Sequence, residues 1–244
     1  MNKKATLLIK NLEAIYSMDP KRGQDGIVYH AYIAIHHDQI LKIDQTLDPS
    51  IIDKDTRIID ARGHFAIPAF IEAKGNIEDV DSIPQALQTY HERMNYFHHG
   101  ILTIAHIHIQ NELVETEVVP YKEHASYPLV DMNAVLVDHK KFTKKQFCIT
   151  TYDAMMKNHD SLLIARMLYR KYHTDAMTLL KAMSLYPARR LGLSKLGMLK
   201  EGFQADFLLC QGKALDDLFS SFDGKGFDQV IKRGIRVFPS ILRS

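Results

Sequence analysis

Apolar and polar residues alternate with a period of two over much of the first 65 residues. Ile27, Tyr29, Ala31, Ile33 and Ile35 occupy every second position, which predicts that they share one face of a strand. Shorter apolar runs, bounded by polar and turn-forming residues, predict further strands at residues 7–9, 14–16, 40–43 and 58–60. The N-terminal part of the chain is therefore predicted to be β-structure joined by tight turns.

The apolar period changes to three and four residues in the middle of the chain. Positions between Ile83 and Phe97 follow this helical spacing, and Gly100 supplies a C-terminal stop. Asp160 and Asp175 can cap two further helices, which we expect at about residues 161–172 and 176–186. Apolar runs between these helices predict strands at residues 101–109, 130–137 and 147–150. Alternating helices and strands are typical of an α/β layer.

The C-terminal part returns to β-structure. Residues 205–210 are predicted to form a strand, and residues 230–238 a hairpin with its turn at Arg233 and Gly234. Two β ends around an α/β middle predict a composite architecture, in which both ends of the chain build one β-domain.

Composition narrows the class of protein. The chain has 244 residues, 46% of them hydrophobic, and a formal net charge of +2. These values exclude a disordered chain and give no charge footprint for nucleic acid or an anionic membrane. Cys148 and Cys210 make no disulfide framework, and no apolar run approaches the ~20 residues of a membrane span. We expect a cytoplasmic protein.

Three segments of the chain resemble the amidohydrolase superfamily, which includes imidazolonepropionase and cytosine deaminase. Residues 6–43 resemble the opening β-domain of that family. Residues 58–73, IIDARGHFAIPAFIEA, resemble the entry into its barrel. Residues 179–210 resemble its C-terminal signature, in which Pro187, Gly202 and Asp206 match directly. The resemblance implies a hydrolase of carbon–nitrogen bonds other than peptide bonds, built on a metal-binding (β/α) barrel.

The metal site implied by this resemblance is altered. The first barrel strand of the family ends in His-x-His, and the matching positions here are Lys74 and Asn76. A protonated lysine cannot ligate a metal, and asparagine is a weak ligand for a transition metal. Residues 149–153 resemble the family's last-strand motif, so Asp153 is the candidate for the general base, with a plain strand-end acid as the alternative.

The length of the chain limits the barrel. The resemblance assigns residues 1–67 and 196–244 to the composite β-domain, which we expect to be a β-sandwich, and leaves residues 68–195 for the barrel. A complete (β/α) barrel takes roughly 200–250 residues. We therefore expect an α/β fold with a truncated (β/α) barrel-like layer. An open half barrel exposes strand edges, so we expect homo-oligomers that cover them.

His106 and His108 form a true His-x-His at the end of the strand predicted at residues 101–109. Side chains two residues apart on a strand face the same way, so both rings could hold one metal ion. His139, His124 or Asp153 could complete such a site. A solvated or interfacial pair of histidines is the alternative interpretation.

Two hypotheses follow. The first is a binding or interaction protein descended from an amidohydrolase, with no conventional metal centre, no cofactor and impaired catalysis. It could hold a small-molecule ligand. The second is an active hydrolase of a small cyclic amide, in which zinc or a similar divalent metal on His106 and His108 activates water and Asp153 moves its proton.

Overall fold

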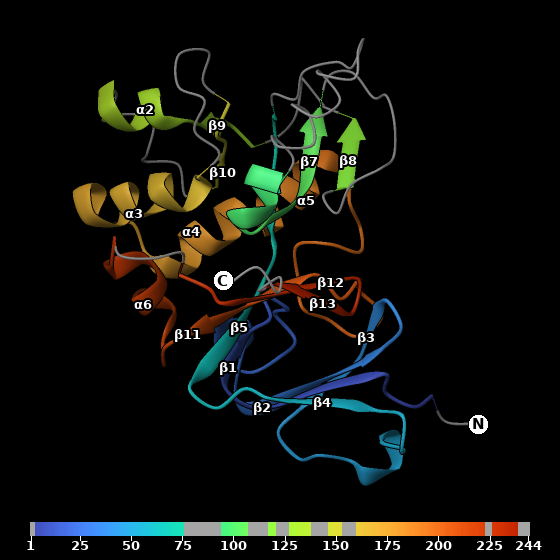
Figure 1. Ribbon diagram of the computed structural model, residues 1–244. Helices are drawn as coiled ribbons and strands as arrows, with labels where there is room; N and C mark the ends of the chain where they lie inside the picture. Colours follow the sequence, from blue (N-terminus) through green and yellow to red (C-terminus); the bar gives the residue numbers. More distant parts are fainter. Residues whose placement is uncertain are drawn as a thin grey trace, which may run out of the picture. The chain divides into compact units, whose positions relative to one another are not determined.

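The computed structural model describes residues 3–75, 94–106, 117–120, 127–137, 146–152, 160–222 and 226–238 (Figure 1). The chain divides into two compact units. Unit 1 consists of Met1–Ala69, Met198–Leu218 and Asp223–Ser244, and unit 2 of Phe70–Gly197 and Phe219–Phe222. The first unit thus combines residues from both ends of the chain.

Strands from both ends of the chain share one sheet in unit 1. Its order is β13-β12-β11-β5-β1-β2-β3, and β4 also pairs with β1. β5 joins the two ends because it pairs in parallel with β1 and antiparallel with β11. This unbroken pairing produces one continuous sheet. The β-sandwich arrangement of the composite domain stays a prediction. The strands are β1 (Leu7–Tyr16), β2 (Ile27–His36), β3 (Gln39–Asp44), β4 (Arg57–Asp60), β5 (His64–Pro68), β11 (Phe207–Gln211), β12 (Gln229–Lys232) and β13 (Ile235–Phe238).

β1 is a single ten-residue strand, although the sequence predicts two short ones. A register shift between Ile9 and Leu12 interrupts its pairing with β2, and Asn11 lies there with a φ of 61°. The Asn11 side chain donates a hydrogen bond of 3.0 Å to Asp60. This β-bulge bends the strand. Before the bulge β1 pairs with β4, and after it β1 pairs with β5.

The core of unit 1 lies on both faces of β2. Ala31, Ile33 and Ile35 are buried in one cluster, as their spacing predicts, while Tyr32 is buried in a second cluster. Tyr29 does not share their face and is 51% exposed. The reason is His30, whose positive φ of 50° interrupts the regular alternation of the strand.

A buried ion pair joins β12 to the segment before β11. Lys232 Nζ lies 2.7 Å from Asp206 Oδ2, and the Arg233 N–H donates to Asp206 Oδ1 at 2.7 Å. Asp206 therefore holds the β12–β13 turn. Gly202, another matched residue of this signature, has a positive φ of 76°.

The described residues of unit 2 contain two small parallel sheets. One has the order β6-β7-β8, made of Phe70–Glu72, Ile101–His106 and Glu117–Pro120, and the other pairs β9 (Leu129–Val130) with β10 (Cys148–Ile149). Residues 94–98 are helical, and the rest of the helix predicted between Ile83 and Phe97 lies outside the described residues. Gly100 follows with a φ of 78°, the conformation of a helix stop.

Two helices of unit 2 begin at aspartate caps. Asp160 accepts a hydrogen bond from Leu163 N at the start of α3 (Ser161–Tyr172), and Asp175 accepts one from Thr178 N at the start of α4 (Ala176–Met183). Both caps confirm the prediction. α3 and α4 lie side by side in Figure 1.

Two predicted elements of unit 2 are wrong. Residues 132–137 form helix α2 (Met132–Val137) in place of a strand, because Asp131 accepts a hydrogen bond from Ala134 N and caps a helix. The helix predicted to reach Tyr186 is two helices, α4 and α5 (Leu185–Leu191). Pro187 explains the break. In a continuous helix its ring would clash with the backbone carbonyl of the residue four positions earlier.

A last short helix, α6 (Leu215–Ser220), follows β11, and its first N–H donates to the Tyr16 hydroxyl at 2.8 Å. Within the described parts of the chain, no helix combines the length and the apolar character that crossing a membrane requires.

Candidate functional site

A buried carboxylate marks the carboxyl end of β6. Glu72 is 1% exposed and lies in an otherwise apolar strand. Its Oε1 accepts hydrogen bonds from Thr150 Oγ1 at 2.6 Å and from Lys74 N at 3.0 Å. Its Oε2 accepts two more, from Thr151 N at 2.8 Å and Thr151 Oγ1 at 2.7 Å. Each carboxylate oxygen therefore has two donors, which matches its two lone pairs.

These hydrogen bonds connect two strands from distant parts of the sequence. Thr150 and Thr151 directly follow β10, and Thr150 Oγ1 also lies 3.1 Å from the carbonyl oxygen of Lys74. The carboxyl ends of β6 and β10 are thus held together by side chains. The carboxyl ends of parallel strands are where α/β folds usually place ligand sites.

Burial sets the electrostatics of Glu72. Removal from water raises the pKa of the Glu72 carboxyl, and hydrogen bonds from Thr150, Lys74 and Thr151 lower it in part. A buried carboxylate without donors would be costly, so the two threonines are needed to keep this group inside the protein.

Lys74 continues from β6 toward the same end. Its ammonium lies 3.9 Å from the centroid of the Tyr152 ring, in a cation–π contact. The next residue, Gly75, donates to the Ala105 carbonyl at 2.7 Å. A Cβ at Gly75 would lie 2.2 Å from Ile104 Cγ2, so only glycine fits this close approach to β7.

Cys148 lies in β10 but offers no reactive thiol. The side chain is fully buried, and burial raises the pKa of the Cys148 thiol to about 12 even though Arg190 lowers it. The thiol therefore stays protonated near neutral pH and is a poor nucleophile and metal ligand. Arg190, from α5, donates to the Tyr127 carbonyl at 2.6 Å, and Tyr127 stacks on Tyr186.

The predicted metal and base residues are described only in part. His106 is the last residue of β7, opposite Pro120 of β8 in the parallel pairing. The other residues of the predicted set lie outside the described residues: His108, His124, His139, Asp153 and Asn76. Within the described ranges, no three His, Cys, Asp or Glu side chains gather as a metal site would require.

The described groups at the first metal anchor do not fit a divalent ion. A metal needs ligands with free lone pairs, whereas both oxygens of Glu72 already accept two hydrogen bonds each. Lys74 places an ammonium on the same strand end, at a position where the family resemblance implies a histidine.

Sequence reasoning missed Glu72 as a site residue. The signal was present, since a carboxylate within Phe70-Ile71-Glu72-Ala73 has to find partners if the strand is buried. The identity of those partners depends on which strands the fold brings together, and Thr150 lies 78 residues away.

A family model and several solved structures are similar to this chain. The amidohydrolase family model matches residues 130–237, from β9 to β13. The atrazine chlorohydrolase TrzN from Arthrobacter aurescens TC1, complexed with zinc, has a TM-score of 0.62 at 12% identity, with 94% of each chain covered. An adenosine deaminase from Xanthomonas campestris with bound zinc has a TM-score of 0.66 at 10% identity, covering 97% of this chain and 93% of that one. No curated protein matches the sequence.

A Xaa-Pro dipeptidase with bound methionine is similar as well, with a TM-score of 0.69 at 10% identity and coverage of 95% of this chain and 99% of that chain. Identities this low speak for the fold alone. Together with the family match over residues 130–237 and the sequence motifs, they support the predicted resemblance of the chain to the amidohydrolase superfamily.

Proposed function

We propose that this protein is a ligand-binding member of the amidohydrolase superfamily, with no conventional metal centre and with impaired hydrolysis. We further propose that unit 2 is a reduced (β/α) barrel and that the chain works as a homo-oligomer. The observation that carries the proposal is the end of β6, where Glu72 is saturated with hydrogen bonds and Lys74 supplies an ammonium.

The chemistry of the site supports this proposal. In metal-dependent hydrolases the bound ion lowers the pKa of a water molecule, which makes a nucleophile at neutral pH. The groups described at the end of β6 offer no ligand with a free lone pair for such an ion. They also offer no activated nucleophile of their own, since the Cys148 thiol has a pKa of about 12. The described residues thus hold two strands together, and among them none supplies a metal ligand or an activated nucleophile.

The short barrel supports the oligomer. β6, β7 and β8 form an open three-stranded sheet within the described residues. Open edges favour association with another chain unless they are covered. Sedimentation of the full chain tests this part, and a monomer at micromolar concentration would contradict it.

A second candidate function is an active metal-dependent hydrolase with His106 and His108 as ligands and Asp153 as the base. One observation favours it. His106 ends β7, the parallel neighbour of β6, and so lies on the carboxyl side of the same sheet. The similar chlorohydrolase and adenosine deaminase structures contain zinc. In this case a small cyclic amide is the expected class of substrate.

The metal content of the purified, untagged full chain separates the two functions. Elemental mass spectrometry after incubation with zinc and desalting should give far less than one zinc ion per chain, with no change in the double variant His106→Ala/His108→Ala. Near-stoichiometric zinc that is lost in the double variant would overturn the first proposal and establish the second. The single variant His64→Ala, on a different unit, is the matched control for histidine loss.

A further inference from the structure

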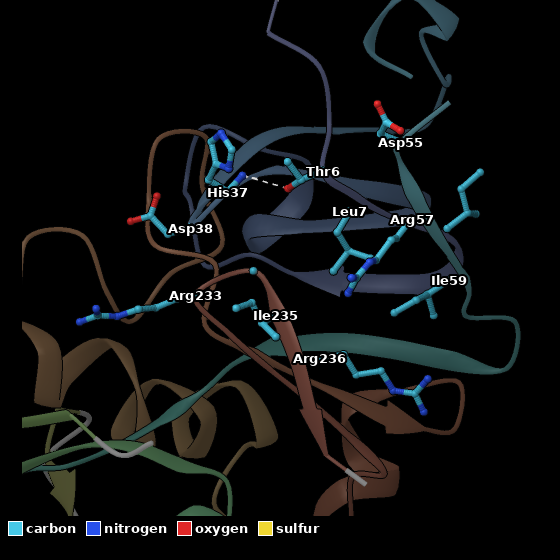
Figure 2. A pocket seen from close by; sticks show the side chains of 12 residues that line it. Thr6, Leu7, His37, Asp38, Asp55, Arg57, Ile59, Arg233, Ile235 and Arg236 are labelled. Carbon is cyan, nitrogen blue, oxygen red and sulfur yellow. Dashed lines mark hydrogen bonds between the residues drawn. The ribbon is translucent and has the colours of Figure 1, made fainter. Parts of the chain in front are cut away.

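Unit 1 contains a groove that the amidohydrolase resemblance does not explain. Its cavity of about 980 Å³ lies between β4, the start of β1, the β2–β3 turn and β13. Figure 2 shows Arg57 and Ile59 on β4, and Ile235 and Arg236 on β13, around the open space. Every lining residue belongs to unit 1. The groove therefore shares no residue with the site at the end of β6.

Two sheet edges border this groove. Three consecutive residues of β4, Arg57 to Ile59, line it, and so do consecutive residues from Arg233 to Arg236. Successive side chains of a strand point to opposite faces, so a consecutive run marks the edge of the strand and not one face of it. Within the described sheet, β4 pairs with β1 alone and β13 with β12 alone.

The free edge of β4 can accept another strand. Arg57 N donates to the Thr6 carbonyl at 3.1 Å, and Ala61 N donates to the Lys10 carbonyl at 2.9 Å. Residues of a parallel strand direct their backbone groups alternately to either side, so the Ile58 N–H and C=O point away from β1. An unpaired edge of this kind is a template for strand addition.

The side chains of the groove combine apolar surface with positive charge. Ile58 is 52% exposed and Ile235 is 61% exposed, among the most exposed large hydrophobic residues of the described chain. The three arginines of the lining outnumber its two aspartates, Asp38 and Asp55. Neither the Arg57 nor the Arg236 guanidinium contacts a carboxylate among the described residues. A partner with apolar side chains and carboxylates complements this surface.

We propose that this groove binds an extended acidic peptide segment, which adds as a strand to the free edge of β4 and places apolar side chains against Ile58 and Ile235. The carboxylates of the segment pair with Arg57 and Arg236. This proposal does not depend on the chemistry at Glu72, so a result that contradicts one of the two proposals leaves the other unaffected.

The first test uses two synthetic peptides on the full chain. Fluorescence anisotropy compares labelled Glu-Val-Glu-Val-Glu-Val-Glu with its lysine counterpart Lys-Val-Lys-Val-Lys-Val-Lys. We expect the acidic peptide to bind at least about tenfold more tightly. Equal binding, or tighter binding of the lysine peptide, overturns the proposal.

Variants locate the binding. Arg57→Glu/Arg236→Glu should weaken binding of the acidic peptide by about tenfold or more and favour the lysine peptide. The control Lys213→Glu reverses an exposed charge of the same unit outside the groove and should leave the affinity unchanged. The side chains of Arg57, Arg236 and Lys213 are all exposed, so circular dichroism of these variants should give the wild-type spectrum. Equal losses in the control overturn the proposal.

Backbone pairing has its own readout. N-methylation of alternate residues of the acidic peptide removes strand donors and should abolish binding, while hydrogen exchange should show protection of the Ile58 amide in the complex with the unmethylated peptide. Binding that survives N-methylation, or an Ile58 amide that gains no protection, overturns strand addition. Self-association of the chain that buries Ile58 and excludes the peptide would identify a second copy as the occupant and also overturn it.

Discussion

A buried carboxylate in unit 1, Asp206, and one in unit 2, Glu72, are stabilised in different ways. In unit 1, Asp206 contacts the Lys232 ammonium at 2.7 Å and is 5% exposed. In unit 2, Glu72 is 1% exposed and accepts hydrogen bonds from two threonines and from backbone N–H groups. The first carboxylate has a full positive charge beside it, and the second is held by neutral donors.

The difference separates a structural feature from a candidate site. A buried ion pair between two side chains fixes the β12–β13 turn and leaves nothing for a ligand. Neutral donors hold Glu72 in place without neutralising it, and burial raises the pKa of its carboxyl. Groups with shifted pKa values cluster at functional sites. The predictions below test this contrast, from the largest expected effect to the smallest.

Asp206→Asn should cause the largest loss of stability, about 3–5 kcal/mol, because it leaves the buried Lys232 ammonium without its partner charge. Urea denaturation followed by circular dichroism measures the free energy of unfolding. The double variant Asp206→Asn/Lys232→Met removes both charges and should recover part of the loss. If the double variant is less stable than the single one, the pair is not the source of the effect.

Glu72→Gln should lower the free energy of unfolding by about 1–3 kcal/mol at pH 7. The NH2 group of the glutamine is a donor, and it would face N–H and hydroxyl groups that now donate to the carboxylate. The same urea titration gives the value. Thr150→Ala/Thr151→Ala serves as the partner variant, and combining it with Glu72→Gln should add less than the sum of the two losses. Strict additivity would show that the threonines and Glu72 do not act together.

The pH dependence of stability should differ between wild type and Glu72→Gln. Because the pKa of Glu72 is raised in the folded state, its favourable contribution is complete below about pH 4.3, the ordinary value for glutamate. It is lost as pH rises toward the folded pKa, since the unfolded state releases the proton first. Between pH 4 and 8, the urea midpoint of unfolding of the wild type should therefore fall with rising pH, relative to the midpoint of the variant. A wild-type advantage that grows with pH would contradict the raised pKa.

Lys74→Met should have the smallest effect on stability, with a loss of about 0.5–1 kcal/mol for the contact with Tyr152. Thermal unfolding is sensitive enough to detect it. Tyr152→Leu should cost a similar amount, and the double variant should cost little more than either single one. A much larger loss from Lys74→Met would mean that the ammonium has a structural role beyond the ring.

Local patterns predicted most of the architecture. Asp160 and Asp175 precede amphipathic runs, and each caps the helix that its position predicts, because a cap depends on residues three positions away. The turn at Arg233 and Gly234 is equally local. The strand predicted at residues 132–137 is wrong because a short apolar run fits either a strand or a helix. The hydrogen bond from Ala134 N to Asp131 caps this segment as a helix.

The site was harder to predict because its partners are distant in the sequence. The motif resemblance assigns Lys74 and Asn76 to the first metal-anchor positions, but it gives no reason to connect Glu72 with Thr150 and Thr151. Only the folded arrangement of β6 and β10 brings them together. The predicted ligands His108 and Asp153 stay predictions, since they lie outside the described residues.

The central claim is that the end of β6 carries an ammonium where a metal ligand is implied, so that the site excludes a divalent ion. Zinc affinity of the full chain, measured by competition with a chromogenic chelator, tests it directly when wild type is compared with Lys74→His/Asn76→His. The account predicts weak binding by wild type and a gain of at least about tenfold in the variant, which removes the ammonium and adds two imidazole ligands. Tight zinc binding by wild type that the two substitutions fail to strengthen would contradict it.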